Sequence, residues 1–222
     1  MTGLFITFEG GEGAGKSTQV TRLSGRLRER GIDTLVTREP GGSPRAERIR
    51  ASILAGHGKP FGAFAEALMF YAARADHLET VIRPALERGT VVVCDRFSDS
   101  TRAYQGSRGE VEDATLRLLE RVVVGGTRPD LTFVLDLPAA EGLARAAERR
   151  RGRGEAADRF EQEDLAFHAR LREAFLAIAR AEPARCHVVD AARGPDAVAE
   201  EVWSIVERRI ASVAETRDMT TA

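Results

Sequence analysis

A glycine-rich run near the start of the chain has the residue types and spacing that bind a polyphosphate. It reads Gly10-Gly11-Glu12-Gly13-Ala14-Gly15-Lys16-Ser17, which fits the spacing G-x-x-x-x-G-K-[ST], and Thr18 follows it. Glycines let backbone N–H groups wrap closely around phosphate oxygens, because a Cβ would obstruct the approach. Lys16 would then reach the β- and γ-phosphates, and the Ser17 hydroxyl would ligate the Mg²⁺ that accompanies a nucleotide. The run predicts a nucleoside triphosphate site.

The segments on either side of this run strengthen the prediction. Residues 4–8 form an apolar run typical of a strand, and residues 19–30 continue with helical spacing. A helix that begins there presents its N-terminus to the bound anion. The alternative is a glycine-rich turn before an ordinary helix. The strand before the run and the helix after it favour the phosphate loop.

A carboxylate ends a second apolar strand. Residues 90–94 read Thr-Val-Val-Val-Cys, which is typical of a strand buried on both faces, and Asp95-Arg96 follow. In P-loop nucleotide binders a strand-terminating acid lies beside the metal. The alternative is an ion pair that merely ends the strand. We predict that Asp95 lies near Mg²⁺.

Two polar stretches and one helical arginine are candidates for a binding pocket. Residues 37–42 form a turn-rich segment after the short strand 34–36, at the strand end where open α/β sheets bind ligands. Residues 97–106 are too polar for a core and are predicted to line a pocket. Arg50 lies in a predicted helix over 45–54, where it faces either solvent or a phosphate.

A cluster of arginines follows the fourth predicted strand. Its members lie among Gly152 and Gly154 and are Arg145, Arg149, Arg150, Arg151 and Arg153. By itself such a cluster indicates a solvated helix face. In a chain with a phosphate loop, it favours a mobile lid over about 149–160. Arginines on a lid neutralise transition-state charge and exclude water once both substrates are bound.

Length and composition set limits on the class of protein. The chain has 222 residues and a formal net charge of -1, which gives no overall attraction for nucleic acid or an anionic membrane. With two separate cysteines, Cys94 and Cys186, and no membrane-length apolar segment, we expect a soluble cytoplasmic protein with reduced thiols. We expect one α/β domain over 1–213 and a frayed tail at 214–222. Its sheet is predicted to be mostly parallel with helices on both faces and strands at 4–8, 34–36, 90–94, 131–137 and 186–190.

Taken together, these motifs resemble the bacterial thymidylate kinase family, which phosphorylates dTMP with ATP. The resemblance extends from Phe5 to about Val206. Besides the phosphate loop, its marks are Thr37-Arg38-Glu39-Pro40-Gly41-Gly42, Leu68-Met69-Phe70-Tyr71-Ala72-Ala73-Arg74, Asp95-Arg96-Phe97, Ser100-Thr101, Ala103-Tyr104-Gln105-Gly106 and Asp158-Arg159-Phe160-Glu161. The resemblance implies a P-loop nucleoside-monophosphate-kinase fold with a five-stranded parallel sheet. It also implies Mg²⁺, a closing lid and a homodimer, which we expect to form through the helices predicted at 45–54 and 63–87.

The resemblance also implies roles at the acceptor end of the site. Phe70 is similar to the aromatic residue that stacks on thymine, and Arg74 is similar to the residue that hydrogen-bonds the base. Their i and i+4 spacing places both on one helix face. Arg96 is similar to the ligand of the acceptor phosphate, with Asp95 and Glu9 near the metal and the phosphates. The other implied pocket residues are Tyr104 against the deoxyribose, Ser100, Thr101, Gln105, Arg50 and, behind the nucleotide site, Glu161.

The composition of the phosphate loop indicates which segment supplies the catalytic arginine. Glu12 within the loop, with arginines in the lid, resembles the bacterial arrangement, in which the lid supplies the positive charge. The lid is about one residue longer before Asp158 than the family pattern. This leaves Arg149, Arg151 and Arg153 as alternatives, and we favour Arg153, with Arg149 second. Arg102 also departs from the pattern and places a charge in the pocket segment.

The expected chemistry is direct in-line transfer of the ATP γ-phosphoryl group to dTMP. It requires positioning and charge stabilisation, and no general base, because the acceptor phosphate is already ionised. A kinase for another nucleoside monophosphate is the nearest alternative. The residues that distinguish it from a thymidylate kinase are Phe70 to Arg74 together with Tyr104-Gln105. A GTPase-like switch would need an N/T-K-x-D motif. With lysine only at Lys16 and Lys59, none is possible.

Overall fold

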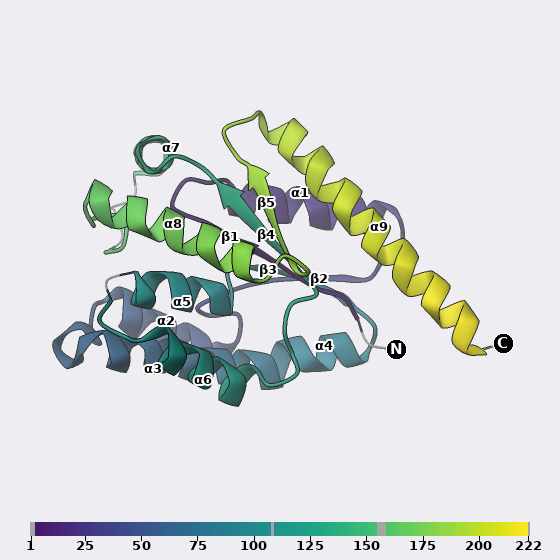
Figure 1. The fold of residues 1–222 in the computed structure, drawn as a ribbon, viewed down its shortest axis with the longest axis horizontal. Coiled ribbons are helices and arrows are strands. Elements are labelled where there is room, and N and C mark those ends of the chain that lie inside the picture. Colours follow the sequence, from purple (N-terminus) through teal and green to yellow (C-terminus); the bar gives the residue numbers. More distant parts are fainter. Residues whose placement is uncertain (1–2, 108, 155–158, 222) are drawn as a thin grey trace.

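Apolar, β-branched segments form a five-stranded sheet in the computed structural model. The structure describes residues 3–107, 109–154 and 159–221, and the backbone alone at 153 and 213–221. Every neighbouring pair of strands is parallel, in the order β2-β3-β1-β4-β5 (Figure 1). This confirms the predicted α/β fold with a five-stranded parallel sheet. The strands are β1 (Phe5–Glu9), β2 (Thr34–Arg38), β3 (Val91–Asp95), β4 (Leu131–Asp136) and β5 (Cys186–Asp190).

Helices cover both faces of the sheet. One face is covered by α1 (Lys16–Glu29) and α9 (Pro195–Thr221), and α9 continues past position 213, where the sequence predicted its end (Figure 1). The other helices in the described part of the chain are α2 (Pro44–Leu54), α3 (Gly62–His77), α4 (Arg83–Glu87), α5 (Ser98–Gly106), α6 (Asp113–Val124), α7 (Ala139–Arg153) and α8 (Leu165–Ala181). None of the helices described is both long and apolar enough to cross a bilayer.

The alternation of side chains along β1 explains the two helical layers. Ile6 and Phe8 are fully buried in the cluster formed with α1 and α9, whereas Phe5 packs in the opposite cluster with Leu78 and Ile82. Successive residues of a strand point to opposite faces, so a strand covered on both faces must be apolar throughout. The core therefore holds the central strand rigidly, and the phosphate loop leaves its carboxyl end.

The long helical region predicted over 63–87 changes its winding near Pro84. A π-helical turn at Leu78–Ile82 separates α3 from α4, and Pro84 is near the start of α4. Proline has no N–H, and its ring crowds the carbonyl four residues before it. A wider π turn relieves that crowding. The single helix predicted over 63–87 is thus interrupted by a π-helical turn before Pro84.

The polar stretch at residues 97–106 is buried, contrary to the expectation that it is too polar for a core. It forms α5, where Asp99 is 1% exposed and Arg102 is 4% exposed. Arg102 pairs with Asp99 at 3.2 Å and with Glu182 at 2.8 Å, and it is absent from the cavity lining described below. Burial of these charges is possible because each is paired. One face of α5 therefore packs through ion pairs, and the opposite face is free to line a cavity.

Candidate active site

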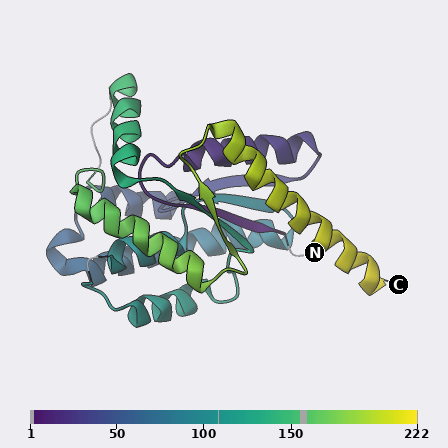
Figure 2. The same ribbon diagram turned by 45° about the horizontal axis from the view of Figure 1, so that its top comes forward.

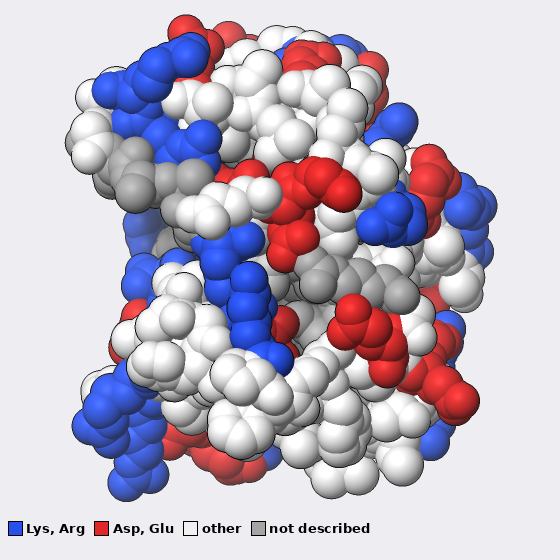
Figure 3. All heavy atoms as spheres, turned by 90° about the vertical axis from the view of Figure 1, so that its left-hand side faces the viewer, with Lys and Arg blue, Asp and Glu red and all other residues white. Residues whose placement is uncertain are grey.

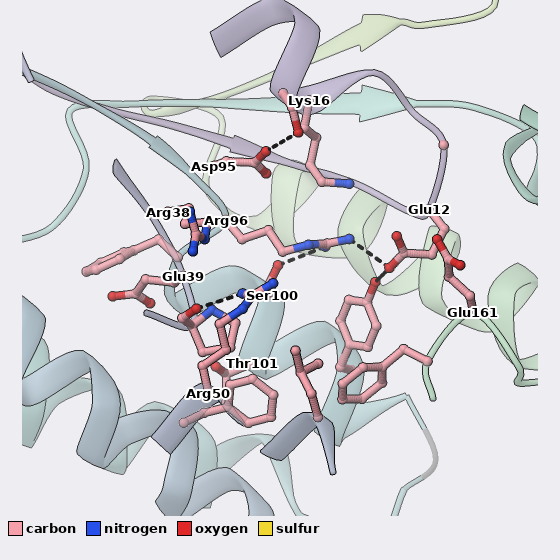
Figure 4. A pocket seen from close by; sticks show the side chains of 18 of the residues that line it. Glu12, Lys16, Arg38, Glu39, Arg50, Asp95, Arg96, Ser100, Thr101 and Glu161 are labelled. Atoms are coloured by element: carbon pink, nitrogen blue, oxygen red, sulfur yellow. Dashed lines mark hydrogen bonds and ion pairs between the residues drawn. The ribbon is translucent and has the colours of Figure 1, made fainter. Parts of the chain in front are cut away.

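A cavity of about 440 Å³ opens at the carboxyl ends of β1, β2 and β3. This is the edge where open α/β sheets bind ligands. Basic and acidic side chains gather around the hollow on this side of the molecule (Figure 3). The residues predicted for the site that line it are Glu12, Gly13, Gly15, Lys16, Ser17, Thr18, Arg50, Phe70, Arg74, Asp95, Arg96, Ser100, Thr101, Tyr104, Gln105, Arg149 and Glu161. The structure thus brings most of the predicted residues together (Figure 4).

The phosphate loop has a backbone that favours glycine at two points. Gly13 has φ +68°, and a Cβ there would lie 2.0 Å from the carbonyl oxygen of Gly142. Gly15 has φ +90° and precedes α1 without a side chain to cap the helix. The first N–H groups of a helix have no acceptor within the helix. They are therefore available to phosphate oxygens at this end of the cavity.

The Lys16 side chain folds back against the phosphate loop. Its Nζ donates to the carbonyl oxygens of Gly10 at 3.1 Å and Gly11 at 2.7 Å. Burial lowers the pKa of Lys16 to about 8, with Arg96 acting in the same direction and Glu12 opposing it. Gly10, Gly11 and Ala14 shape the loop from outside the cavity lining. A bound polyphosphate would raise the pKa of Lys16 again, because its negative charge favours the ammonium form.

Ser17 and Asp95 form an oxygen-rich corner beside the loop. The Ser17 hydroxyl donates to Asp95 Oδ2 at 2.6 Å. A hydroxyl and a carboxylate suit Mg²⁺, which takes few protein ligands and otherwise binds water and nucleotide phosphates. In the described part of the chain, no group of three or more His, Cys, Asp or Glu side chains could hold a metal by itself. These residues fit a magnesium ion that arrives with its nucleotide.

Glu9 has a different place from the metal ligand that the sequence predicted. It is fully buried, Oε1 accepts from the Phe97 N–H at 2.7 Å, and Oε2 accepts from the Ser100 hydroxyl at 2.5 Å. Burial, reinforced by the charge of Asp99, raises the pKa of Glu9 to about 8. Glu9 lies behind the cavity wall, and both its oxygens are engaged. The geometry supports a role in holding the start of α5.

Arg96 lies at the centre of the cavity in a left-handed conformation. Its φ is 67°, which is uncommon for a residue with a Cβ and clusters at functional sites. Its guanidinium donates to Glu12 Oε1 at 2.8 Å and to the Gly10 carbonyl at 3.0 Å. Tyr104 donates to the same Glu12 oxygen at 2.5 Å. Arg96 therefore touches both the phosphate loop and the wall formed by α5.

The charge of Glu12 depends on its contact with Arg96. Burial by itself would raise the pKa of Glu12, but the positive charges of Arg96 and Lys16 outweigh it and lower the pKa to about 2. Burial alone would lower the pKa of Arg96, but Tyr104 and Glu12 outweigh burial and raise it. Glu12 and Arg96 are thus both ionised at neutral pH.

The far end of the cavity combines aromatic rings with unpaired hydrogen-bonding atoms. The Phe70 and Phe160 rings lie 6.3 Å apart. Arg74 is fixed by Glu39 at 2.7 Å and by Thr101 at 3.0 Å. Among the residues that the structure describes, neither its buried Nη1 nor the buried Oε1 of Gln105 has a hydrogen-bond partner. Unpaired buried polar atoms are rare in native proteins and indicate a ligand or water.

The lid region contributes Arg149 to the cavity. α7 stands out from the body of the protein (Figure 2). Arg149 at its end pairs with Glu161 at 3.1 Å, and Arg150 pairs with the same carboxylate. Arg151 is exposed. The side chain of Arg153 and residues 155–158 lie outside the described part, so the choice of Arg153 stays a prediction.

Two charged cavity residues come from the segment 37–42, which the sequence predicted as a pocket candidate without giving its members individual roles. Arg38 and Glu39 both lie at the end of β2, and Arg38 pairs with Glu47 at 3.0 Å. Glu39 is buried and holds Arg74. The position directly after a parallel strand was the signal both for this segment and for Asp95. The cavity lining also includes Pro40, Leu54, Phe97 and Phe160, to which the sequence gave no individual role in the site.

The parallel sheet, with a phosphate loop after its central strand and an arginine-bearing helical arm over the cavity, defines a P-loop kinase of the nucleoside-monophosphate type. The model of the thymidylate kinase family matches residues 8–202. Thymidylate kinases from Bradyrhizobium diazoefficiens and Nitrobacter winogradskyi are each 57% identical, over 94% and 93% of this chain and 90% and 89% of their own. The chain belongs to the thymidylate kinase family.

A solved structure is similar over nearly the whole chain. The crystal structure of thymidylate kinase from Ehrlichia chaffeensis superposes with a TM-score of 0.75 at 32% identity. The superposition covers 93% of this chain and 99% of that one. The predicted fold and enzyme class are therefore confirmed.

Proposed function

We propose that this chain transfers the γ-phosphoryl group of ATP to the phosphate of dTMP, giving dTDP and ADP, in the cytoplasm. The observation that carries the proposal is that one cavity holds a phosphate loop at one end and Phe70 with the unpaired Nη1 of Arg74 at the other. Arg96 lies between the two ends. A nucleoside monophosphate in this cavity directs its phosphate toward the loop and its base away from it.

The chain's own residues supply positioning and charge. Lys16 and the N-terminus of α1 hold the β- and γ-phosphates, and Arg96 holds the acceptor phosphate. Ser17 and Asp95 would hold Mg²⁺, which would neutralise phosphate charge when bound. An acceptor oxygen attacks the γ-phosphorus, and the bond to the bridging oxygen of ADP breaks. Arg149, or Arg153 as the sequence favoured, stabilises the charge of the transferring group.

Thymine fits the unpaired atoms at the far end of the cavity. Arg74 Nη1 is a donor that suits thymine O4, and Gln105 Oε1 is an acceptor that suits the thymine N3–H. Cytosine presents an amine and an unprotonated ring nitrogen in these places. It would leave both protein atoms unpaired, which costs far more than one missing methyl group. Phe70 provides a stacking surface that accepts any base.

The proposed homodimer has support from exposed apolar side chains. Phe64 and Leu68 on α3 are 47% and 42% exposed, and Leu118 and Val122 on α6 are 52% and 75% exposed. α3 and α6 are in contact, so these side chains lie on neighbouring helices. Two copies of this apolar surface would bury each other. We therefore propose α3 and α6 for the contact, whereas the sequence led us to expect the helices at 45–54 and 63–87. A light-scattering mass of one chain would refute the dimer.

A coupled assay of ADP release tests the proposed reaction. ADP release should require dTMP, ATP and Mg²⁺ together. Lys16→Ala should abolish it in a folded protein, because Lys16 clamps the transferring group. Near-normal turnover by folded Lys16→Ala would contradict the assignment of the phosphate loop.

A further inference from the structure

A chain of hydrogen bonds runs behind the base end of the cavity. Its centre is Glu39, whose Oε2 accepts from Arg74 Nε at 2.7 Å and whose Oε1 lies 3.1 Å from His77 Nδ1. His77 Nε2 lies 2.7 Å from the Thr37 hydroxyl. Arg74 is 2% exposed, Glu39 5% and His77 0%. Polar groups buried to this degree are held by their partners, and loss of one partner affects the others.

The chemistry of the partners fixes the proton of His77. A carboxylate paired with a guanidinium only accepts hydrogen bonds, so His77 Nδ1 carries the proton that Glu39 Oε1 accepts. In neutral imidazole, Nε2 is then an acceptor for the Thr37 hydroxyl. Gly42 covers this contact, because a Cβ there would lie 2.3 Å from His77 Nε2 and 2.6 Å from Thr37 Oγ1. The two contacts thus hold the His77 ring in position, with its Nδ1–H directed at Glu39.

Glu39 in turn fixes the plane of the Arg74 guanidinium. Arg74 donates through Nε to Glu39 and through Nη2 to Thr101 at 3.0 Å. Its buried Nη1 has no partner in the described part of the chain. Arg74, Glu39 and Thr101 line the cavity, whereas His77 lies outside its lining. The hydrogen bond to Glu39 therefore links His77 to the cavity wall.

We propose that His77 is a positioning residue for recognition of the acceptor's base. It occupies the second oxygen of Glu39, so that this carboxylate holds Arg74 by Nε and leaves Nη1 for the ligand. Without the Nδ1–H donor, Glu39 Oε1 is left unpaired in a buried site and turns to the guanidinium. There it competes with the base for N–H donors. This inference rests on the proposed function, specifically on the contact between Arg74 and thymine.

Two amide substitutions separate the two hydrogen bonds of His77. In His77→Asn, the side-chain amide reaches about as far as Nδ1 and keeps the donor to Glu39. In His77→Gln, the longer side chain reaches toward Thr37 instead and loses that donor. We measure kcat and KM for dTMP and dCMP, KM for ATP, and the thermal midpoint of each variant.

His77→Gln is expected to raise the KM for dTMP and to reduce the preference for dTMP over dCMP roughly ten- to hundredfold, with KM for ATP unchanged. His77→Asn is expected to keep the preference of the wild type. If both variants keep the preference, or both lose it equally, the proposal is wrong. A merely structural role would lower the thermal midpoint without changing the preference.

If His77→Gln does not fold, a second variant still tests whether Glu39 positions Arg74. Glu39→Gln keeps the shape of Glu39 but places an amide where the paired carboxylate was, and it is expected to give the same loss of preference. Wild-type enzyme with no preference for dTMP over dCMP would refute the proposed function itself. The inference about His77 fails separately, when the wild type has the preference and the variants do not alter it as stated.

Discussion

The Ser17 hydroxyl donates a 2.6 Å hydrogen bond to Asp95 Oδ2, although 78 positions separate the two residues. β1 and β3 are adjacent parallel strands, so the segments that leave their carboxyl ends meet at one edge of the sheet. The contact puts a hydroxyl and a carboxylate together beside the phosphate loop. It is the structural basis for the first prediction.

Asp95→Asn should weaken the response to magnesium. The amide keeps the shape of Asp95 but removes its charge, and we expect roughly a ten- to hundredfold higher Mg²⁺ requirement for turnover. Titration of MgCl₂ at saturating ATP and dTMP measures it. Glu9→Gln is the matched control, since Glu9 lies behind the cavity wall. An unchanged Mg²⁺ requirement in Asp95→Asn would remove Asp95 from the metal site.

Arg149→Ala should lower kcat by roughly 100- to 1000-fold with little change in dTMP binding. Arg149 lines the cavity from the end of α7, and a charge that acts on the transferring group is felt chiefly in the transition state. Steady-state kinetics and dTMP titration calorimetry give the two numbers. Arg151→Ala is the comparison, since Arg151 is on the same helix but does not line the cavity. A larger loss in Arg153→Ala than in Arg149→Ala would return the role to Arg153.

Glu9 should make the ligand-free protein less stable as the pH rises. Its pKa is about 8 in the folded protein and near the ordinary 4.5 in the unfolded chain. The unfolded chain therefore releases this proton first. The free energy of unfolding falls between about pH 4.5 and 8, by at most about 1.4 kcal/mol per pH unit.

Urea unfolding of wild type and Glu9→Gln across that range measures the effect. The amide cannot ionise, so the variant should lack this part of the pH slope. Equal slopes for the two proteins would show that Glu9 is already ionised in the folded state.

Tyr104→Ala should narrow the preference for deoxyribose over ribose. Tyr104 is nearly buried, and its hydroxyl is tied to Glu12, so the ring is fixed in the cavity wall. A fixed ring beside the sugar leaves little room for a 2′-hydroxyl. The ratio of kcat/KM for dUMP to that for UMP should fall in the variant. A ratio that stays constant would place the sugar elsewhere.

The sequence predicted those parts of the molecule that depend on neighbouring residues. The phosphate loop follows from the spacing of Gly15, Lys16 and Ser17 within one run, and the strands follow from continuous apolar segments. The polar face of α5 was misjudged, because Arg102 is neutralised by Glu182, which is distant in the sequence. The link from Glu39 to His77 was missed for the same reason. The first contact is set by the packing of α5 against α8, and the second by the approach of α3 to the end of β2. No local sequence pattern encodes either arrangement.

We propose that the far end of this cavity selects thymine on a deoxyribose monophosphate. The most direct test is kcat/KM for dTMP, dUMP, dCMP and UMP, measured with one enzyme preparation by ADP release. We expect dTMP to be the best substrate, dUMP to be poorer by the value of one methyl group, roughly 1–3 kcal/mol, and UMP to be poorer than dUMP. We expect dCMP to be rejected strongly. A kcat/KM for dCMP or UMP equal to that for dTMP would contradict the account.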